Sequence, residues 1–284
     1  MKFITYIYNE EERVGFNEEE HIGFVEEDRV YKIKGYDMVG LIGNYEKIDF
    51  EGIRKSEAPL LMADIKILSP IVKPIHDVIC VGKNYADHIR EMGSEVPEDF
   101  IATYFGKRAT RIMGSNEEIE GRFDLDEGMD YESELAVIIG KECKNVKKED
   151  ALDYIFGFTI FNDITSRIIQ KKHNQWFRGK SFDQYNAMGP YIVTKDEVDH
   201  GNLAIKSYVN DELRQNSNTN NMIIKIEEII EELSSGMTLE PGDIISTGTP
   251  EGVGMGYKPP RFLKAGDCVR CEVEGLGSLV SRIV

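Results

Sequence analysis

Cysteine is scarce in this sequence, which has only four in 284 residues, at positions 80, 143, 268 and 271. Four widely spaced cysteines are too few for a disulfide scaffold, which excludes a small disulfide-stabilised secreted fold. Cys268 and Cys271 stand three residues apart in an alternating strand pattern. Their sulfurs are therefore expected to point to opposite faces of a strand rather than to share a metal ion. The cysteine content favours reduced thiols and a cytoplasmic protein.

Long apolar runs and basic residues are also lacking. No stretch approaches the ~18 apolar residues of a membrane span, and the N-terminus turns acidic by residue 10, unlike a signal peptide. Lysine and arginine number 34 against 51 acidic residues, a formal net charge of −17. A chain this acidic repels phosphate backbones and anionic lipid surfaces. We therefore expect a small-molecule partner, with neither nucleic acid nor membrane.

Hydrophobic residues make up 41 % of the chain, enough for a sizeable core. The first 65 residues contain four short apolar stretches of strand length, FITYIY, HIGFV, RVYKI and MVGLIG. Later, ELAVIIG and YIFGFTIFND predict buried strands, and residues 222–233 predict an amphipathic helix. The pattern indicates an α+β, mainly β fold, with a small β-rich N-terminal domain over 1–68 and a larger domain over 69–284.

Two glutamates stand one residue apart at the start of the run ELAVIIG. In a strand, Glu132 and Glu134 project to the same face, where unpaired buried carboxylates would repel each other. Asp163 closes the second apolar stretch. Three carboxylates without histidine or cysteine beside them favour a hard cation, Mg²⁺ or Mn²⁺, over zinc. Spacing alone leaves open the alternative of a rim of solvated acids.

A histidine and a glutamate three residues apart form a second candidate feature, His88 and Glu91 in GKNYADHIREMG. On a short helix this spacing makes the two side chains neighbours. A carboxylate beside an imidazole raises its basicity and orients it, as a general base for water requires. The alternative is an ordinary exposed His–Glu pair.

From about residue 70 to the C-terminus, the chain resembles the fumarylacetoacetate hydrolase family. The resemblance rests on VGKNYADHIREMG, DYESELAVIIGKECKNV, ALDYIFGFTIFNDITSRIIQ, QWFRGKSFDQYNAMGPYIV and LEPGDIISTGTPEGVG. Several long motifs in the family's order make the match specific. The resemblance implies the family's mixed β-roll, usually assembled as a homodimer, and a small N-terminal domain of the kind that many bacterial members carry.

The resemblance also implies roles for individual residues. The family's three metal ligands fall on Glu132, Glu134 and Asp163. Its catalytic residues, of which the first two lie on a lid, fall on His88, Glu91 and Lys180. Its substrate-binding positions fall on Arg167, Gln170, Gly248 and Thr249. The implied cofactor is Mg²⁺ or Mn²⁺, and the implied substrate is a small 2-oxo acid.

From the resemblance we expect Mg²⁺-dependent hydrolysis of a C–C bond in acylpyruvates such as fumarylpyruvate or acetylpyruvate. His88, oriented by Glu91, would deprotonate the attacking water, and the enolate of pyruvate would leave. The alternatives are an isomerase or decarboxylase of 2-hydroxyhepta-2,4-diene-1,7-dioate or 5-carboxymethyl-2-hydroxymuconate type compounds, or an oxaloacetate decarboxylase or tautomerase. A non-catalytic binding protein is the alternative from another class. We expect Lys107, Arg108 and Arg111 to meet a distal carboxylate of the substrate.

Overall fold

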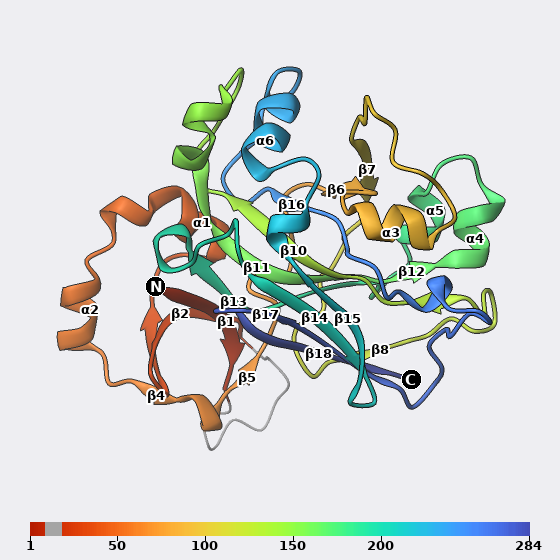
Figure 1. Cartoon of the computed structure of the whole chain (residues 1–284). Helices are drawn as coiled ribbons and strands as arrows, with labels where there is room; N and C mark the ends of the chain where they lie inside the picture. The colour runs from red at the N-terminus through yellow and green to blue at the C-terminus, as the bar shows by residue number, and fades with distance from the viewer. Residues whose placement is uncertain (9–18) are drawn as a thin grey trace.

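One large mixed sheet organises the chain in the computed structural model, which describes residues 1–8 and 19–284. In those ranges eleven strands form it, in the order β4-β3-β2-β1-β13-β11-β10-β16-β6-β7, with β5 paired to β1 (Figure 1). Their bounds are β1 (Lys2–Ile7), β2 (His21–Glu26), β3 (Arg29–Ile33), β4 (Leu60–Leu61), β5 (Lys66–Ile67), β6 (Val78–Gly82), β7 (Thr103–Lys107), β10 (Ser133–Ile139), β11 (Ile155–Asp163), β13 (Asn186–Thr194) and β16 (Ile244–Ser246). The two predicted segments share this sheet where β1 pairs with β13, and the boundary at residue 68 stays a prediction.

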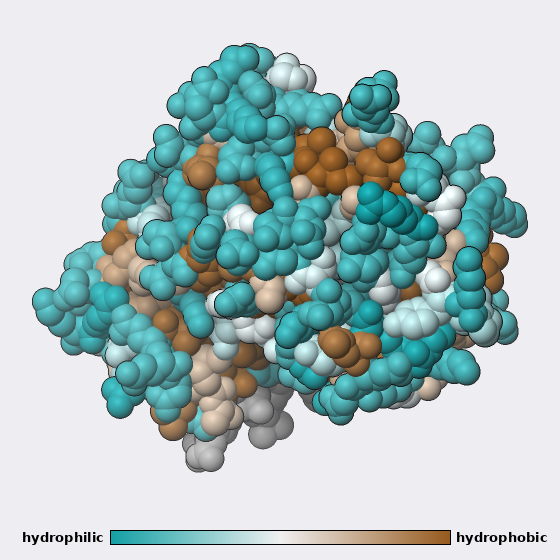
Figure 2. Space-filling view, viewed as in Figure 1, coloured by the Kyte–Doolittle hydropathy of each residue, from teal (hydrophilic) through white to brown (hydrophobic). Residues whose placement is uncertain are grey.

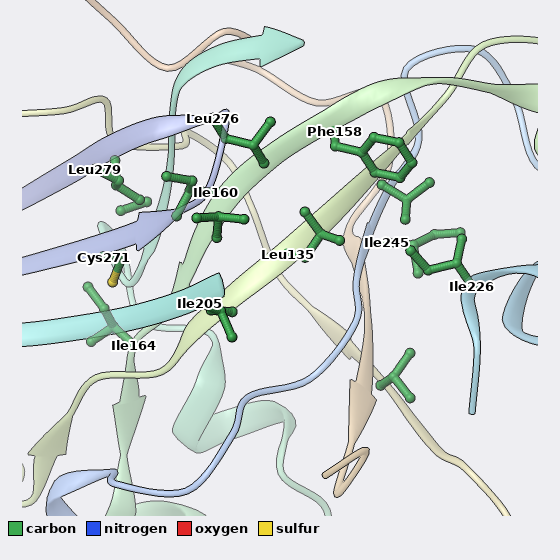
Figure 3. Packing of buried hydrophobic residues seen from close by; sticks show 14 of the residues in the cluster. Leu135, Phe158, Ile160, Ile164, Ile205, Ile226, Ile245, Cys271, Leu276 and Leu279 are labelled. Atoms are coloured by element: carbon green, nitrogen blue, oxygen red, sulfur yellow. The ribbon is translucent and has the colours of Figure 1, made fainter. Parts of the chain in front are cut away.

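A smaller sheet packs against one face of the larger one. Its order is β15-β14-β17-β18-β8. The bounds are β8 (Glu118–Ile119), β14 (Ala204–Val209), β15 (Glu212–Asn218), β17 (Cys268–Val273) and β18 (Gly277–Ile283). Figure 3 shows the core between the sheets, with Leu135 and Ile160 of the larger sheet near Ile205 and Leu279 of the smaller. In β17, Cys268 is partly exposed and Cys271 is buried, which confirms that their side chains alternate.

Strand β10 is buried along its whole length because both of its faces are covered. Leu135 and Val137 belong to the core between the sheets. Ala136 and Ile138 belong to a second core cluster that includes apolar side chains of α1 (Met38–Asn44). Full burial of each large aliphatic side chain stabilises the fold by about 1.5–3 kcal/mol. This explains the continuous apolar run, which the sequence analysis correctly predicted as a buried strand.

The sequence-based prediction of a strand at MVGLIG is wrong, since these residues form α1. The Asp37 carboxylate accepts a hydrogen bond from the Gly40 N–H (2.7 Å) and caps the helix N-terminus. Helical spacing then turns Met38, Leu41 and Ile42 toward the core together. A six-residue apolar stretch fits either element, and here the capping aspartate favours the helix.

The predicted helix over 222–233 exists but begins later, as α6 (Ile226–Ser234). The Asn84 side chain holds the preceding residues extended. Its amide bonds both the N–H (2.8 Å) and the carbonyl (3.0 Å) of Ile224. The remaining helices are α2 (Phe50–Ser56), α3 (Ala86–Glu91), α4 (Arg167–Lys172) and α5 (Phe177–Lys180). Within the described ranges, every helix is too short or too polar to cross a membrane.

Candidate active site

Strand pairing brings the three predicted carboxylates together. Glu132 directly precedes β10 and Glu134 is its second residue, so the two side chains share a face. The antiparallel register sets Asp163, the last residue of β11, opposite Glu132, and the Asp163 N–H bonds the Glu132 carbonyl (2.9 Å). One carboxylate oxygen of each residue lies within 4.8 Å of the others, and all three side chains are buried. The structure thus favours the buried cluster over the rim of solvated acids.

Lys180, the last residue of α5, bridges two of these carboxylates. Its Nζ donates to Oε2 of Glu132 (2.6 Å) and to Oδ2 of Asp163 (2.6 Å), and the side chain is only 2 % exposed. Helices α4 and α5 approach closely because Gly179 lacks a side chain, and a Cβ there would overlap the backbone of Gln170. The carboxylates hold the pKa of Lys180 above its usual value although burial opposes this. The carboxylates therefore favour the protonated form of this lysine.

A second lysine supports the cluster from the side opposite the solvent. Lys107, at the end of β7, is fully buried, and its Nζ bonds the Asp163 carboxylate and the Ile164 carbonyl (2.8 Å). The expectation that Lys107, Arg108 and Arg111 meet a substrate carboxylate is therefore wrong. Arg108 pairs with Asp77 (3.5 Å), and Arg111 pairs with Glu117 (2.6 Å).

Arg167, at the start of α4, links the cluster to a further carboxylate that the sequence analysis missed. Its guanidinium donates to Oε1 of Glu132 (2.6 Å) and to Oδ2 of Asp130 (2.9 Å). It also donates to Oε1 of Gln170 (3.2 Å). Asp130 is fully buried and precedes Glu132 by two residues. That spacing was the available signal in the sequence, since Asp130, Glu132 and Glu134 alternate with other residues, although in the structure Asp130 ends a separate short strand.

The predicted histidine–glutamate pair lies on α3. The Nδ1 of His88 is 3.4 Å from Oε2 of Glu91, and both side chains are largely buried, which disagrees with the alternative of an exposed pair. The other oxygen of Glu91 accepts a hydrogen bond from the Gly252 N–H (2.8 Å). Glu91 is thus held in place on one side and faces the imidazole on the other. Such a pair can orient a histidine for proton transfer.

The loop over residues 248–256 donates backbone hydrogen bonds to carboxylates from three elements. The Gly248 N–H bonds Glu134 (2.9 Å), the Gly252 N–H bonds Glu91, and the Gly254 N–H bonds Asp130 (2.7 Å). Gly248 has φ +98°, a conformation that favours glycine. Thr249 lines the cavity, as the predicted substrate role requires, whereas the Gly248 N–H is engaged by Glu134.

Replacing Gly256 with alanine should lower turnover through Glu91. A Cβ at this position would overlap the Glu91 carboxylate and push it away from His88 and from the Gly252 N–H. We expect kcat to fall by about 10-fold or more, because the histidine loses its orienting partner. Gly236→Ala is the matched control, since no atom lies within 4 Å of the added Cβ. Unchanged kcat in Gly256→Ala would show that the position of Glu91 does not matter.

Ionisation of Glu134 is the least favourable in the cluster, since no ion-pair partner stands beside it in the part of the chain that the structure describes. Burial, followed by repulsion from Asp163 and Glu132, raises the pKa of Glu134 to about 8. Burial also opposes ionisation of Glu132, but Lys180 and Arg167 outweigh it and hold the pKa of that carboxyl below its usual value. Three convergent, buried oxygen donors without sulfur or imidazole suit a hard divalent cation. The residues present therefore fit the predicted metal ion.

These groups surround a cavity of about 200 Å³. An apolar wall faces the charged groups, and Figure 2 shows brown apolar surface over β6 and β7, two of the strands that contribute to that wall. The cavity is lined by Val81, Gly82, Lys83, His88, Ile89, Met92, Ser94, Phe105, Glu132, Glu134, Asp163, Arg167, Gln170, Lys171, Trp176, Lys180, Thr249 and Met255. The three acids, His88 and Lys180 thus line one small cavity that is open to solvent on one side.

Known proteins resemble this chain along most of its length. A family model described as "Fumarylacetoacetate (FAA) hydrolase C-terminal" matches residues 77–284. Oxaloacetate tautomerase YisK of Bacillus subtilis is 45 % identical over 223 residues, covering 78 % of this chain and 74 % of that protein. Among solved structures, fumarylacetoacetate hydrolase (EaFAH) from psychrophilic Exiguobacterium antarcticum superposes with a TM-score of 0.87 at 37 % identity, over 100 % of this chain and 99 % of that one.

A further structure contains a metal ion. Maleylpyruvate hydrolase from Sphingobium sp. SYK-6, in complex with manganese(II) and pyruvate, superposes with a TM-score of 0.80 at 27 % identity, over 100 % of this chain and 99 % of that one. The matches confirm the resemblance seen in the sequence, and they confirm the expected α+β, mainly β fold.

Proposed function

This chain belongs to the fumarylacetoacetate hydrolase family, and we propose that it is a divalent-metal-dependent enzyme that interconverts the keto and enol forms of a small 2-oxo acid. One observation carries the proposal: a cavity of about 200 Å³ is lined by three convergent carboxylates, a buried lysine and a histidine. The volume suits a short-chain acid. The 45 % identical oxaloacetate tautomerase supports the reaction type.

In this proposal Glu132, Glu134 and Asp163 hold the cation, which is Mg²⁺ or Mn²⁺. When bound, the cation supplies positive charge that stabilises negative charge developing on the 2-oxo oxygen. Lys180 holds the carboxylates of Glu132 and Asp163 in place through its two hydrogen bonds, and it adds a positive charge beside the substrate. The Mn²⁺ in the maleylpyruvate hydrolase structure supports a divalent ion.

His88 moves the proton. The ring lines the cavity, and Glu91 faces its Nδ1, which leaves Nε2 as the nitrogen for the substrate. Taking a proton from the carbon next to the 2-oxo group gives the enolate, and returning it to oxygen completes the conversion to the enol. We propose that Arg167, Gln170, Gly248 and Thr249 position the substrate.

Hydrolysis of an acylpyruvate is the second candidate, and the His88–Glu91 pair favours it. A histidine oriented by a carboxylate can deprotonate a water that attacks the distal carbonyl, after which the C–C bond breaks and pyruvate leaves as its enolate. Both candidates use the same cation site. We also propose the homodimer that the resemblance implies.

An assay of both reactions separates the candidates. Metal-free protein is tested with Mg²⁺, with Mn²⁺ and with EDTA, and the substrates are oxaloacetate, acetylpyruvate and fumarylpyruvate. The enol content of oxaloacetate is followed by ultraviolet absorbance, and pyruvate release from the other two by a coupled dehydrogenase. We expect faster enol–keto exchange that EDTA abolishes. Pyruvate release without exchange would favour the hydrolase, and full activity in EDTA would overturn both candidates.

A further inference from the structure

We propose that Lys171 and Lys83 form a subsite for the second carboxylate of the substrate, so that the enzyme prefers 2-oxo dioates to 2-oxo acids with an uncharged tail. This inference rests on the proposed function, because it assumes that the 2-oxo acid end lies at the carboxylate cluster. Both lysines line the cavity.

Lys171 lies on the side of α4 that lines the cavity. Arg167, Gln170 and Lys171 are spaced by three and four residues, so that they share one side of the helix, and all three line the cavity. Arg167 lies innermost, bonded to Glu132, and Lys171 lies one helical turn farther out and is exposed. A turn rises by about 5.4 Å, which is comparable to the length of a short dioate. Lys171 therefore stands where the far end of such a substrate would lie.

Lys83 approaches the cavity from the end of β6. Its φ is +60°, in the left-handed region where glycine is favoured. The neighbouring Gly82 is also constrained, since a Cβ there would overlap the Trp176 ring. The turn after β6 thus packs closely against the Trp176 ring. It places Lys83 in the cavity lining despite the unfavourable backbone conformation of that residue.

Neither lysine has an anionic partner in the part of the chain that the structure describes. In the described ranges, the ammonium groups of Lys83 and Lys171 make no hydrogen bond or ion pair, although the chain has 51 acidic residues. The two cavity lysines are therefore available to an anion from solution.

The charge of the cavity points to the same substrate class. Its lining holds four basic side chains, Lys83, Arg167, Lys171 and Lys180, against the three carboxylates of the cluster. A divalent cation would bring the net charge to plus three with His88 neutral. A monoanionic acid compensates one of these charges, whereas a dioate compensates two. Because Arg108 and Arg111 are paired elsewhere, the chain offers Lys83 and Lys171 for the second carboxylate.

The test compares two ligands of equal carbon number, oxaloacetate and 2-oxobutanoate, of which only oxaloacetate has a second carboxylate. Their affinities are measured by calorimetry in Mg²⁺ for the full-length wild type, Lys171→Met, Lys83→Met and Lys172→Met. Lys172 is the matched control, because it is the adjacent exposed lysine and does not line the cavity. Each cavity variant should weaken oxaloacetate binding by about 10-fold, the effect of losing one charge-assisted contact, and change 2-oxobutanoate binding by less than about 2-fold.

Equal weakening of both ligands in Lys171→Met, or an effect of Lys172→Met as large as that of Lys171→Met, would overturn the subsite. A wild type that binds the two ligands with equal affinity would also overturn it while leaving the proposed function intact. If neither ligand binds the wild type in Mg²⁺, the proposed function fails, and the subsite fails with it.

Discussion

Replacing Glu134 with glutamine should abolish divalent-metal binding and lower kcat by at least about 10³-fold, because the cation loses one of three hard ligands and the developing charge loses its stabilisation. The amide oxygen can still accept the hydrogen bonds that Ser246 and Gly248 donate to this side chain, so the local structure should persist. Mg²⁺ and Mn²⁺ binding is measured by calorimetry and turnover by the assays described above.

The stability of the metal-free proteins separates this result from misfolding. Glu134 is buried and repelled by Glu132 and Asp163, so removing its charge relieves repulsion in the absence of a cation. We expect metal-free Glu134→Gln to be at least as stable to urea at pH 8–9 as the metal-free wild type. The exposed Glu142→Gln is the matched control for loss of one negative charge. Metal binding at wild-type affinity in Glu134→Gln would show that this residue is not a ligand.

Replacing His88 with alanine should lower kcat by about 10²–10⁴-fold, the usual loss for a positioned general acid or base. Binding of oxalate in Mg²⁺ should change little, because the hydrogen bond given for the His88 ring is to Glu91, whereas Lys180 itself bonds Glu132 and Asp163 and stays in place without the ring. Steady-state kinetics and calorimetric titration with oxalate measure the two quantities on the same protein. A loss in turnover without a loss in affinity would place His88 in proton transfer.

Two further variants test this assignment. Glu91→Gln keeps the shape of the partner without its charge and should lower kcat less than His88→Ala does. His173→Ala replaces an exposed histidine next to α4 and should leave both quantities unchanged. If His88→Ala loses oxalate binding together with turnover, the ring is a binding or structural group. Wild-type turnover in His88→Ala would remove it from the mechanism.

The carboxylate cluster could be predicted from the sequence in part. The two-residue spacing of Glu132 and Glu134 defines a shared face without any knowledge of the fold. The contribution of Asp163 depends on the register between β10 and β11, and sequence spacing alone does not give that register. The place of Asp163 at the end of an apolar stretch suggested this third position, the family resemblance supported it, and the structure places it opposite Glu132.

Lys107 shows why other parts of the site could not be predicted. Lys107 stands close in sequence to Arg108 and Arg111, which lie near the surface. For this reason all three cations were expected to meet the distal carboxylate of the substrate. The burial of Lys107 against Asp163 results from the antiparallel pairing of β6 with β7 and from their place in the sheet beyond β16. Such contacts between residues 56 positions apart arise only from the folded topology.

The covering of β10 and β11 has a consequence for truncated forms of the protein. Glu134 and Asp163 project from the same sheet face as Ile138 and Phe161, which pack against Phe3, Leu41 and Ile42 from the N-terminal segment. A fragment starting near residue 69 would therefore present this apolar surface to water, together with the backbone edge of β13 that β1 occupies. Exposed edges and apolar faces of this kind promote strand-to-strand self-association. We therefore expect removal of the first 68 residues to promote aggregation through the sheet that carries the proposed metal ligands.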